Sequence, residues 1–126
     1  MNAYASRVSP PDGAYRVMLV DDSAVIRGLM NRWLSQDPAI SVVGSAGNGL
    51  QALKELERCQ PEVVVLDLEM PIMGGIEALP KLLLASPNLK VIVASSLSLR
   101  NAEISLQALA AGAADYLPKP ESTRDK

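Results

Sequence analysis

The sequence predicts an α/β protein with a mostly parallel sheet, and three observations support this fold class. Two short apolar runs without alternation, residues 17–20 and 63–66, suit strands that are buried on both faces. Such runs alternate along the chain with segments whose apolar residues recur at helical spacings of three and four. The 126 residues, 48% of them hydrophobic and 21% charged, suffice for one globular domain. We therefore expect right-handed crossovers between strands that point the same way.

The first half of the chain predicts two strands, at residues 16–20 and 40–45, each followed by a helix. Ser23 is placed to cap the first helix, and Asp37-Pro38 ends it. One face of that helix is apolar and consists of Val25, Ile26, Leu29, Met30, Trp33 and Leu34. We expect this face to pack in the core, as we do for the methionines elsewhere in the chain. The turn Gly47-Asn48-Gly49 precedes the second helix, which ends before Pro61 and has an apolar face of Leu50, Leu53 and Leu56.

The second half predicts strands at residues 63–66, 91–94 and 114–117, with helices near 75–85 and 101–111. Pro80 falls inside the first of these helices, where it would remove a backbone hydrogen bond unless it lies in the first turn or at a kink. The second carries Ile104, Ala108 and Ala111 on one face, and Gly112 suits the position just after its end.

Composition excludes several classes of function. Histidine is absent, which removes histidine metal sites, Ser-His triads and imidazole acid–base catalysis, and the single Cys59 rules out an internal disulfide. A free thiol suits a reducing cytosol. The net charge of −2 provides no basic field for nucleic acid or anionic lipid, and no apolar run approaches the roughly 18 residues of a membrane span. We expect a cytoplasmic protein whose partners are neither nucleic acid nor membrane.

Polar residues follow the expected strands at their carboxyl ends: Asp21, Asp22, Asp67, Ser95 and Lys119. In the flavodoxin-like strand order 2-1-3-4-5, strands one and three are neighbours, and ligands bind at the crevice where their carboxyl ends meet. Grouped carboxylates repel one another, so their grouping predicts a divalent cation among them. Mg²⁺ takes oxygen ligands and keeps several waters. Asp22 and Asp67 would bind it directly, Asp21 through water, and the backbone carbonyl of Glu69 would supply a further ligand.

This set of residues also permits phosphoryl chemistry. A carboxylate such as that of Asp67 can attack phosphorus to give an aspartyl phosphate, and a metal ion offsets the repulsion from the phosphoryl oxygens. Lys119 would be a cation for the same oxygens, and Ser95 would donate a hydrogen bond to them. Any of these residues alone has an ordinary structural explanation, but the ordered set favours a site.

From about Tyr15 to Pro120 the chain resembles the receiver domain of bacterial two-component response regulators. The matching features are the acidic pair, the segment Asp67-Leu68-Glu69-Met70-Pro71, Ser95, Tyr116 and Lys119-Pro120. Three segments look most like the receiver of the chemotaxis protein-glutamate methylesterase: Asp-Asp-Ser-Ala, Asp-Leu-Glu-Met-Pro-Ile-Met-Gly-Gly and Ala-Ser-Ser-Leu.

The resemblance implies a mechanism and partners. A histidine kinase would pass its phosphoryl group to Asp67 with Mg²⁺, and water would later remove it. Ser95 and Tyr116 would act as the switch, and Lys119-Pro120 is where the family usually has a cis peptide. The output domain would be the protein's own or a separate one. A nucleophile elbow, Gly-x-Ser-x-Gly, is absent, so this chain would catalyse nothing beyond its own phosphorylation and dephosphorylation.

The resemblance also divides the chain. Residues 1–14 are expected to form a disordered leader and residues 15–120 the receiver domain, a doubly wound (βα)5 unit. Residues 121–126 are expected to begin a linker or a truncated fifth helix, so that the fifth helix is truncated or missing. An apolar strip next to the first helix would then stay exposed, which predicts a partner, a swap or a truncated chain and leaves a homodimer open.

Four alternatives remain at this point. A stand-alone or transcription-regulator receiver would share the site, and a pseudo-receiver would keep the fold but lack part of the acidic set. A haloacid-dehalogenase-like phosphatase uses Asp-x-Asp, where this chain has Glu69 as the second acid. A flavodoxin-like electron carrier needs a phosphate loop after strand one, where Asp21-Asp22 would repel the phosphate of FMN.

Overall fold

The computed structural model describes residues 13–96 and 98–119. Five strands alternate with four helices, and the elements are β1 (Tyr15–Val20), α2 (Ala24–Ser35), β2 (Ile40–Ala46), α3 (Gly49–Cys59), β3 (Val63–Asp67), α4 (Gly75–Ala85), β4 (Lys90–Ser95), α5 (Leu99–Ala110) and β5 (Asp115–Pro118). All strand pairs are parallel, and the strands form one sheet in the order β2-β1-β3-β4-β5. The predicted fold class and strand order are confirmed.

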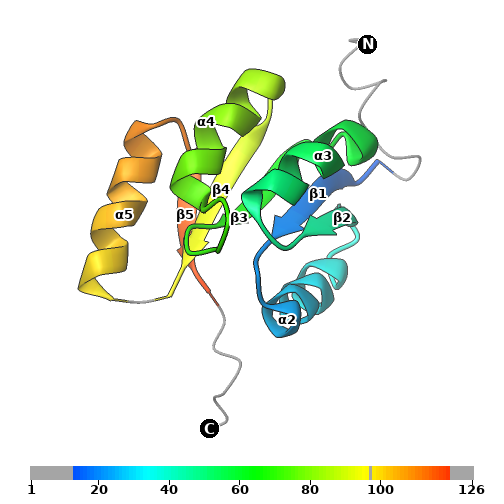
Figure 1. The fold of residues 1–126 in the computed structure, drawn as a ribbon. Coiled ribbons are helices and arrows are strands. Elements are labelled where there is room, and N and C mark those ends of the chain that lie inside the picture. Colours follow the sequence, from blue (N-terminus) through cyan, green and yellow to red (C-terminus); the bar gives the residue numbers. More distant parts are fainter. Residues whose placement is uncertain (1–12, 97, 120–126) are drawn as a thin grey trace, which may run out of the picture.

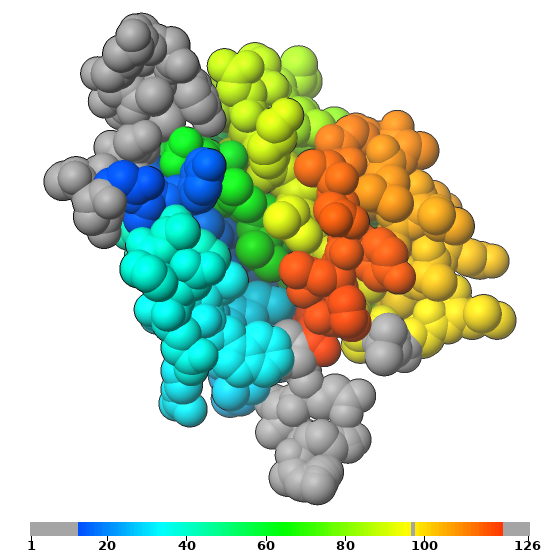
Figure 2. Space-filling view, turned by 180° about the vertical axis from the view of Figure 1, so that it is seen from behind, coloured from blue at the N-terminus to red at the C-terminus, as the bar shows by residue number. Residues whose placement is uncertain are grey.

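The sheet lies between helices on both faces (Figure 1). Helices α3, α4 and α5 cover one face, and α2 covers part of the other, which Figure 2 shows from behind with β5 at the surface. The side chains of β1 divide between two cores: Met18 and Val20 pack under the three helices, while Val17 and Leu19 pack with Ile26 of α2. The apolar runs are therefore strands buried on both faces, as predicted.

The helix boundaries follow from local capping. The Ser23 hydroxyl accepts a hydrogen bond from the backbone N–H of Ile26 at 3.1 Å, so it caps α2 as expected. Helix α5 ends at Ala110, and Gly112 follows two residues later with a φ of +119°, which suits glycine. Backbone N–H groups of Gly112 and Ala113 there donate to the carbonyls of Leu109 and Ala108, which closes the helix end.

Helix α4 forms with the predicted bounds in spite of Pro80, which lies at its sixth residue, beyond the first turn. Proline has no N–H, so it cannot donate the usual hydrogen bond to the carbonyl of Ile76. The proline is exposed, while Ala78, Leu79 and Leu82 of the same helix are buried. Packing of this apolar side against the core therefore offsets the unfavourable helix position of Pro80.

Two predicted core residues of α2 are exposed, and the prediction for them is wrong. Val25 is 61% exposed and Trp33 is 56% exposed, whereas Ile26 and Met30 of the same helix are buried. Val25 and Trp33 lie in the first and last turns of α2. On this face of the sheet α2 is the only helix among the described residues, so no second helix closes over its ends. Leu50, in the first turn of α3, is likewise 46% exposed.

Three predictions fall wholly or partly outside the described residues. They concern most of the leader (residues 1–12), the peptide bond to Pro120 and residues 121–126. Within the described part, through Lys119, the chain has four helices and no fifth. No helix in that part is long and apolar enough to cross a lipid bilayer.

Candidate functional site

The three predicted aspartates lie together at the carboxyl edge of the sheet. Asp21 directly follows β1 and Asp67 is the last residue of β3. These two strands are hydrogen-bonded neighbours, with Val20 opposite Leu66. One carboxylate oxygen from each of Asp21, Asp22 and Asp67 lies within 4.8 Å of the others. Asp21 and Asp67 are each 1% exposed, and Asp22 is exposed to solvent.

The backbone fixes one oxygen of each buried carboxylate. Asp21 Oδ1 accepts a hydrogen bond from the N–H of Ser23 at 2.9 Å, and Asp67 Oδ1 accepts one from the N–H of Glu69 at 3.1 Å. Among the described residues, the second oxygen of each, Oδ2, is buried without a hydrogen bond, and Asp21 Oδ2 has an ion-pair contact with Lys119 Nζ at 3.3 Å. Buried polar atoms without partners are rare. The donor set consists of oxygens alone and leaves Asp67 Oδ2 with neither a hydrogen bond nor an ion pair among the described residues, so it fits a hard divalent cation.

Lys119 is the cation that forms ion pairs with these carboxylates within the described residues. Its Nζ lies 3.3 Å from Asp21 Oδ2 and 3.2 Å from Asp67 Oδ1. The backbone N–H of Lys119 also donates a hydrogen bond to the backbone carbonyl of Ser95 at 3.0 Å. Burial alone would lower the pKa of Lys119, but the charges of Asp67 and Asp21 outweigh it, so the pKa is raised. The ammonium therefore stays protonated and anchors the end of β5 to the acidic cluster.

Asp67 has an unusually high pKa for an aspartate. Burial is the main cause and the charge of Asp21 adds to it, whereas the N–H of Glu69 and the ammonium of Lys119 act in the opposite direction. The net result raises the pKa of Asp67 from 3.8 to about 6. The ammonium of Lys119 alone therefore leaves the Asp67 carboxylate poorly stabilised, and perturbed groups of this kind are typical of functional sites.

Ser95 lies at the end of β4 and is buried, but its hydroxyl is engaged away from the aspartates. Ser95 Oγ shares a hydrogen bond of 3.2 Å with Ser105 Oγ of α5, and both side chains are buried. The neighbouring Ser96 hydroxyl donates to the exposed Glu69 carboxylate at 3.4 Å. Ser95 has one hydroxyl proton, so it can donate to a group bound at Asp67 only when Ser105 is the donor of their shared bond or when that bond breaks.

Tyr116 occupies β5 with 47% of its surface exposed. It pairs with Val93 of β4 across the ladder, so its backbone is fixed while its side chain reaches solvent. This position allows the predicted inward movement, which stays a prediction. The role of the Glu69 carbonyl also stays a prediction.

Sequence reasoning missed three residues around the site. Arg27 donates to the backbone carbonyl of Asp21 at 2.5 Å, and the Asn101 side chain donates to the Ser96 carbonyl and hydroxyl, each at 2.9 Å. Ser105 is the third. Asn101 and Ser105 are spaced by four on the buried side of α5, and polar residues at that spacing, beside the apolar Ala108, are the pattern that would have found them.

Glycine is required where the chain leaves β3. A Cβ atom at Gly75 would lie 2.4 Å from the carbonyl oxygen of Asp67, and one at Gly49 would lie 2.9 Å from that of Met73. Both contacts are closer than side chains allow, so the loop of residues 68–74 packs tightly between the end of β3 and the start of α3. The conformation of Gly74-Gly75, which sequence alone does not determine, is set by this packing.

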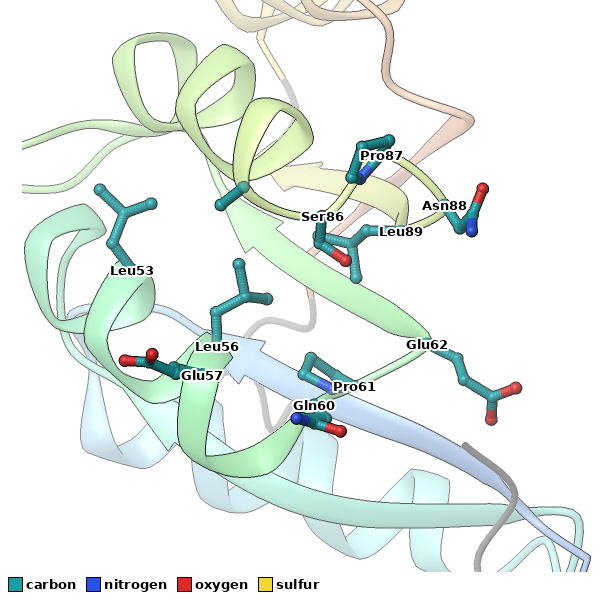
Figure 3. A pocket seen from close by; sticks show the side chains of 11 residues that line it. Leu53, Leu56, Glu57, Gln60, Pro61, Glu62, Ser86, Pro87, Asn88 and Leu89 are labelled. Carbon is teal, nitrogen blue, oxygen red and sulfur yellow. The ribbon is translucent and has the colours of Figure 1, made fainter. Parts of the chain in front are cut away.

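A hollow of about 570 Å³ lies elsewhere, at the opposite edge of the sheet (Figure 3). It lies between the end of α3 and the loop from α4 to β4, with Leu56, Pro61 and Leu89 as apolar walls and Glu57 and Glu62 as acidic ones. None of the predicted site residues lines it. The hollow is thus separate from the acidic cluster.

Comparison with protein families matches residues 17–125 to the family model of the response regulator receiver domain. Among curated relatives, a protein-glutamate methylesterase/protein-glutamine glutaminase 1 of Paramagnetospirillum magneticum is 58% identical over 117 residues, which cover 93% of this chain and 31% of the relative. The protein of the same description from Rhodospirillum rubrum is 59% identical over 113 residues, which cover 90% of this chain and 29% of the relative. The chain therefore spans about a third of the length of these relatives.

Comparison with solved structures also finds response regulator domains. The response regulator domain of Thermotoga maritima CheB superposes with a TM-score of 0.77 and 38% identity, covering 88% of this chain and 83% of that one. A chain in the complex of the P1 domain of CheA3 with CheY6 from R. sphaeroides superposes with a TM-score of 0.73 and 33% identity, covering 86% and 84%.

Proposed function

Because the chain belongs to the family of response regulator receiver domains, we propose that Asp67 accepts a phosphoryl group from the phosphohistidine of a histidine kinase. The observation that supports this most directly is the buried Asp67 carboxylate: Oδ1 accepts a hydrogen bond from the N–H of Glu69, whereas Oδ2 has no hydrogen-bond partner in the part of the chain that the structure describes. Likeness to a chain solved with the P1 domain of CheA3 supports a kinase as the partner.

The transfer exchanges one bond to phosphorus for another. An oxygen of Asp67 forms the new O–P bond while the N–P bond of the phosphohistidine breaks. The electron pair of that bond stays on the imidazole nitrogen, which takes a proton from solvent. Water later attacks the phosphorus of the aspartyl phosphate, which releases inorganic phosphate and restores the carboxylate of Asp67.

Mg²⁺ would be held by the side chains of Asp21, Asp22 and Asp67 and by the carbonyl of Glu69. When bound, the ion would offset the repulsion between these carboxylates and the incoming phosphoryl oxygens. The residues fit it because all the donors are oxygens and because the buried Asp67 Oδ2 has neither a hydrogen bond nor an ion pair within the described part of the chain. Lys119 would exchange part of its contact with Asp67 for the phosphoryl oxygens, since its ammonium lies at 3.2 Å from that residue.

Ser95 and Tyr116 would report the phosphoryl group to the surface. The Ser95 hydroxyl would leave Ser105 and donate to a phosphoryl oxygen, and Tyr116 would turn inward from its exposed position. The two arrangements differ by a few contacts, so phosphorylation would shift their populations.

We infer that the whole protein is a chemotaxis methylesterase regulated by this domain. The relatives in which this segment is about 58% identical carry that description and are about three times as long as the matched segment. A stand-alone receiver or a transcription regulator is the alternative, and the gene downstream of Lys126 distinguishes them. A serine-nucleophile domain supports the methylesterase, whereas a DNA-binding module contradicts it.

Radiolabelled acetyl phosphate tests phosphorylation directly. We expect acid-stable, alkali-labile label on the protein in Mg²⁺ and almost none in EDTA, and Asp67→Asn should abolish the label. Glu103→Gln, an exposed carboxylate on α5, is the matched control and should take up label normally. Normal label on Asp67→Asn would exclude the proposed mechanism.

A further inference from the structure

The loop of residues 68–74 has a path that its neighbours fix. The N–H of Gly49 in α3 donates to the carbonyl of Met73 at 3.0 Å, and the N–H of Gly75 donates to the carbonyl of Leu68 at 3.2 Å. The close approach of Gly75 to Asp67 leaves this end of the loop no room to shift. A residue in the middle part of the loop must therefore adopt whatever backbone conformation closes the turn.

That residue is Ile72, and its conformation is unfavourable for isoleucine. Its φ is +67°, in the left-handed region, and the N–H of Met73 donates across it to the carbonyl of Pro71 at 2.7 Å. A branched Cβ is poorly tolerated at positive φ, where glycine or asparagine would be favoured. The backbone alone therefore selects against isoleucine at this position.

Packing within the chain does not compensate for this strain. The Ile72 side chain is 78% exposed, so most of its apolar surface meets solvent. In the free chain both the positive φ and the exposure of the apolar side chain are therefore unfavourable. Strain of this kind is kept at functional sites, where the side chain acts on something outside its own surroundings.

The position of Ile72 relative to Asp67 indicates what its side chain contacts. It follows Asp67 by five residues, so the two Cα atoms lie no more than about 17 Å apart. An ordinary protein–protein interface covers about 800 Å² on each partner, which corresponds to a radius of roughly 16 Å. A protein that delivers a phosphoryl group to Asp67 covers surface out to about this distance, whereas a small phosphodonor contacts only the site itself. Pro71, the preceding residue, is exposed as well, and so is Ile76 at the start of α4.

We propose that Ile72 is an apolar docking contact for the protein phosphodonor. The inference rests on the proposed phosphorylation of Asp67 and adds a residue that selects the donor without touching the reacting atoms. Its side chain is presented outward by the strained turn and becomes buried against an apolar position of the donor protein. The gain from this burial is realised only in the complex, which explains why the free chain keeps an unfavourable residue here.

Ile72→Asn tests the proposal, because asparagine tolerates positive φ and removes only the apolar surface. The probe is a chemotaxis histidine kinase domain, phosphorylated on histidine, from which the unaltered chain accepts label. We expect the second-order rate of transfer to fall about tenfold, the effect of losing one apolar anchor. With acetyl phosphate the rate should change less than about twofold.

Two comparisons make the result decisive. Leu84→Asn removes an equally exposed leucine (83%) near the end of α4, away from Asp67, and should leave both rates unchanged. Ile72→Gly also fits the backbone and should reproduce the effect of asparagine. Equal rates for Ile72→Asn and the unaltered chain with the kinase domain would overturn the docking role, as would an equal loss with both donors. If the unaltered chain takes no label from acetyl phosphate, the phosphorylation proposal itself fails.

Discussion

At the scale of single residues, Asp67 is held in an environment that opposes its charge. Burial is the largest cause of its raised pKa, about 6 against 3.8, and the contacts from Glu69 and Lys119 offset only part of it. At pH values between 3.8 and about 6, Asp67 keeps its proton in the folded chain but has lost it in the unfolded chain. Stability therefore decreases as pH rises from about 4 to about 6, the reverse of the usual case for a paired aspartate.

The substitution Asp67→Asn should remove this dependence in the metal-free protein. The shift from 3.8 to about 6 corresponds to a gain of roughly 2–3 kcal/mol for the variant at pH 7.5, which should vanish near pH 4. Urea unfolding in EDTA at pH 4, 5.5 and 7.5 measures it. Glu103→Gln should show no such change. A variant no more stable than the parent at pH 7.5 would contradict the raised pKa.

The sequence identifies the acidic residues because their position at strand ends is a local property. Asp21, Asp22 and Asp67 follow recognisable apolar runs, and parallel strands bring them together. The strain at Ile72 has no such local sign, because its φ depends on contacts to Gly49 and Gly75 that only the fold creates. The partner of Ser95, Ser105, depends in the same way on where α5 packs.

At the scale of elements, the helix and strand positions were predictable and their exposed faces were less so. The bounds of α4 match the prediction in spite of Pro80, since apolar spacing and buried packing outweigh one missing hydrogen bond. The exposure of Val25 and Trp33 could not be read from spacing. Periodicity shows which residues share a helix face, but not how far the neighbouring layer extends over it.

Pro80→Ala should stabilise the protein, because alanine restores the N–H that can donate to the carbonyl of Ile76. We expect a gain of about 1–3 kcal/mol, reduced by the greater freedom of the unfolded chain. Thermal and urea unfolding both measure it. Pro87→Ala, in the loop before β4, supplies the control and should give no gain. Equal or lower stability of Pro80→Ala would show that the missing hydrogen bond does not limit the stability of this helix.

Helix α5 holds the Ser95 hydroxyl through Ser105, so Ser105→Ala should favour the phosphorylated arrangement. One neutral hydrogen bond is lost from the resting form alone, which corresponds to about a fivefold change in affinity. Titration with beryllofluoride in Mg²⁺, a mimic of the phosphoryl group, should show this tighter binding by calorimetry. Ser35→Ala, at an exposed hydroxyl of α2, should leave the affinity unchanged. Weaker binding by Ser105→Ala would mean that Ser105 supports Ser95 in both states.

At the scale of the whole molecule, the site joins parts of the chain that are far apart in sequence. Asp21 follows β1, Asp67 ends β3 and Lys119 follows β5, so the acidic cluster forms only when the sheet is complete. The unfolded chain cannot assemble it. A cation that binds the cluster therefore stabilises the whole fold by mass action.

Mg²⁺ should therefore raise the unfolding temperature of the whole domain. At ten times its dissociation constant the stabilisation is about 1.4 kcal/mol, and the effect should weaken below pH 6, where protonation of Asp67 competes with the ion. Thermal unfolding in MgCl₂, compared with NaCl of equal ionic strength, measures the effect. Asp22→Asn should abolish it because one ligand is lost, while Glu103→Gln should keep it. An equal rise in both salts would instead attribute the effect to general screening of the acidic cluster, and the magnesium site would have to be abandoned.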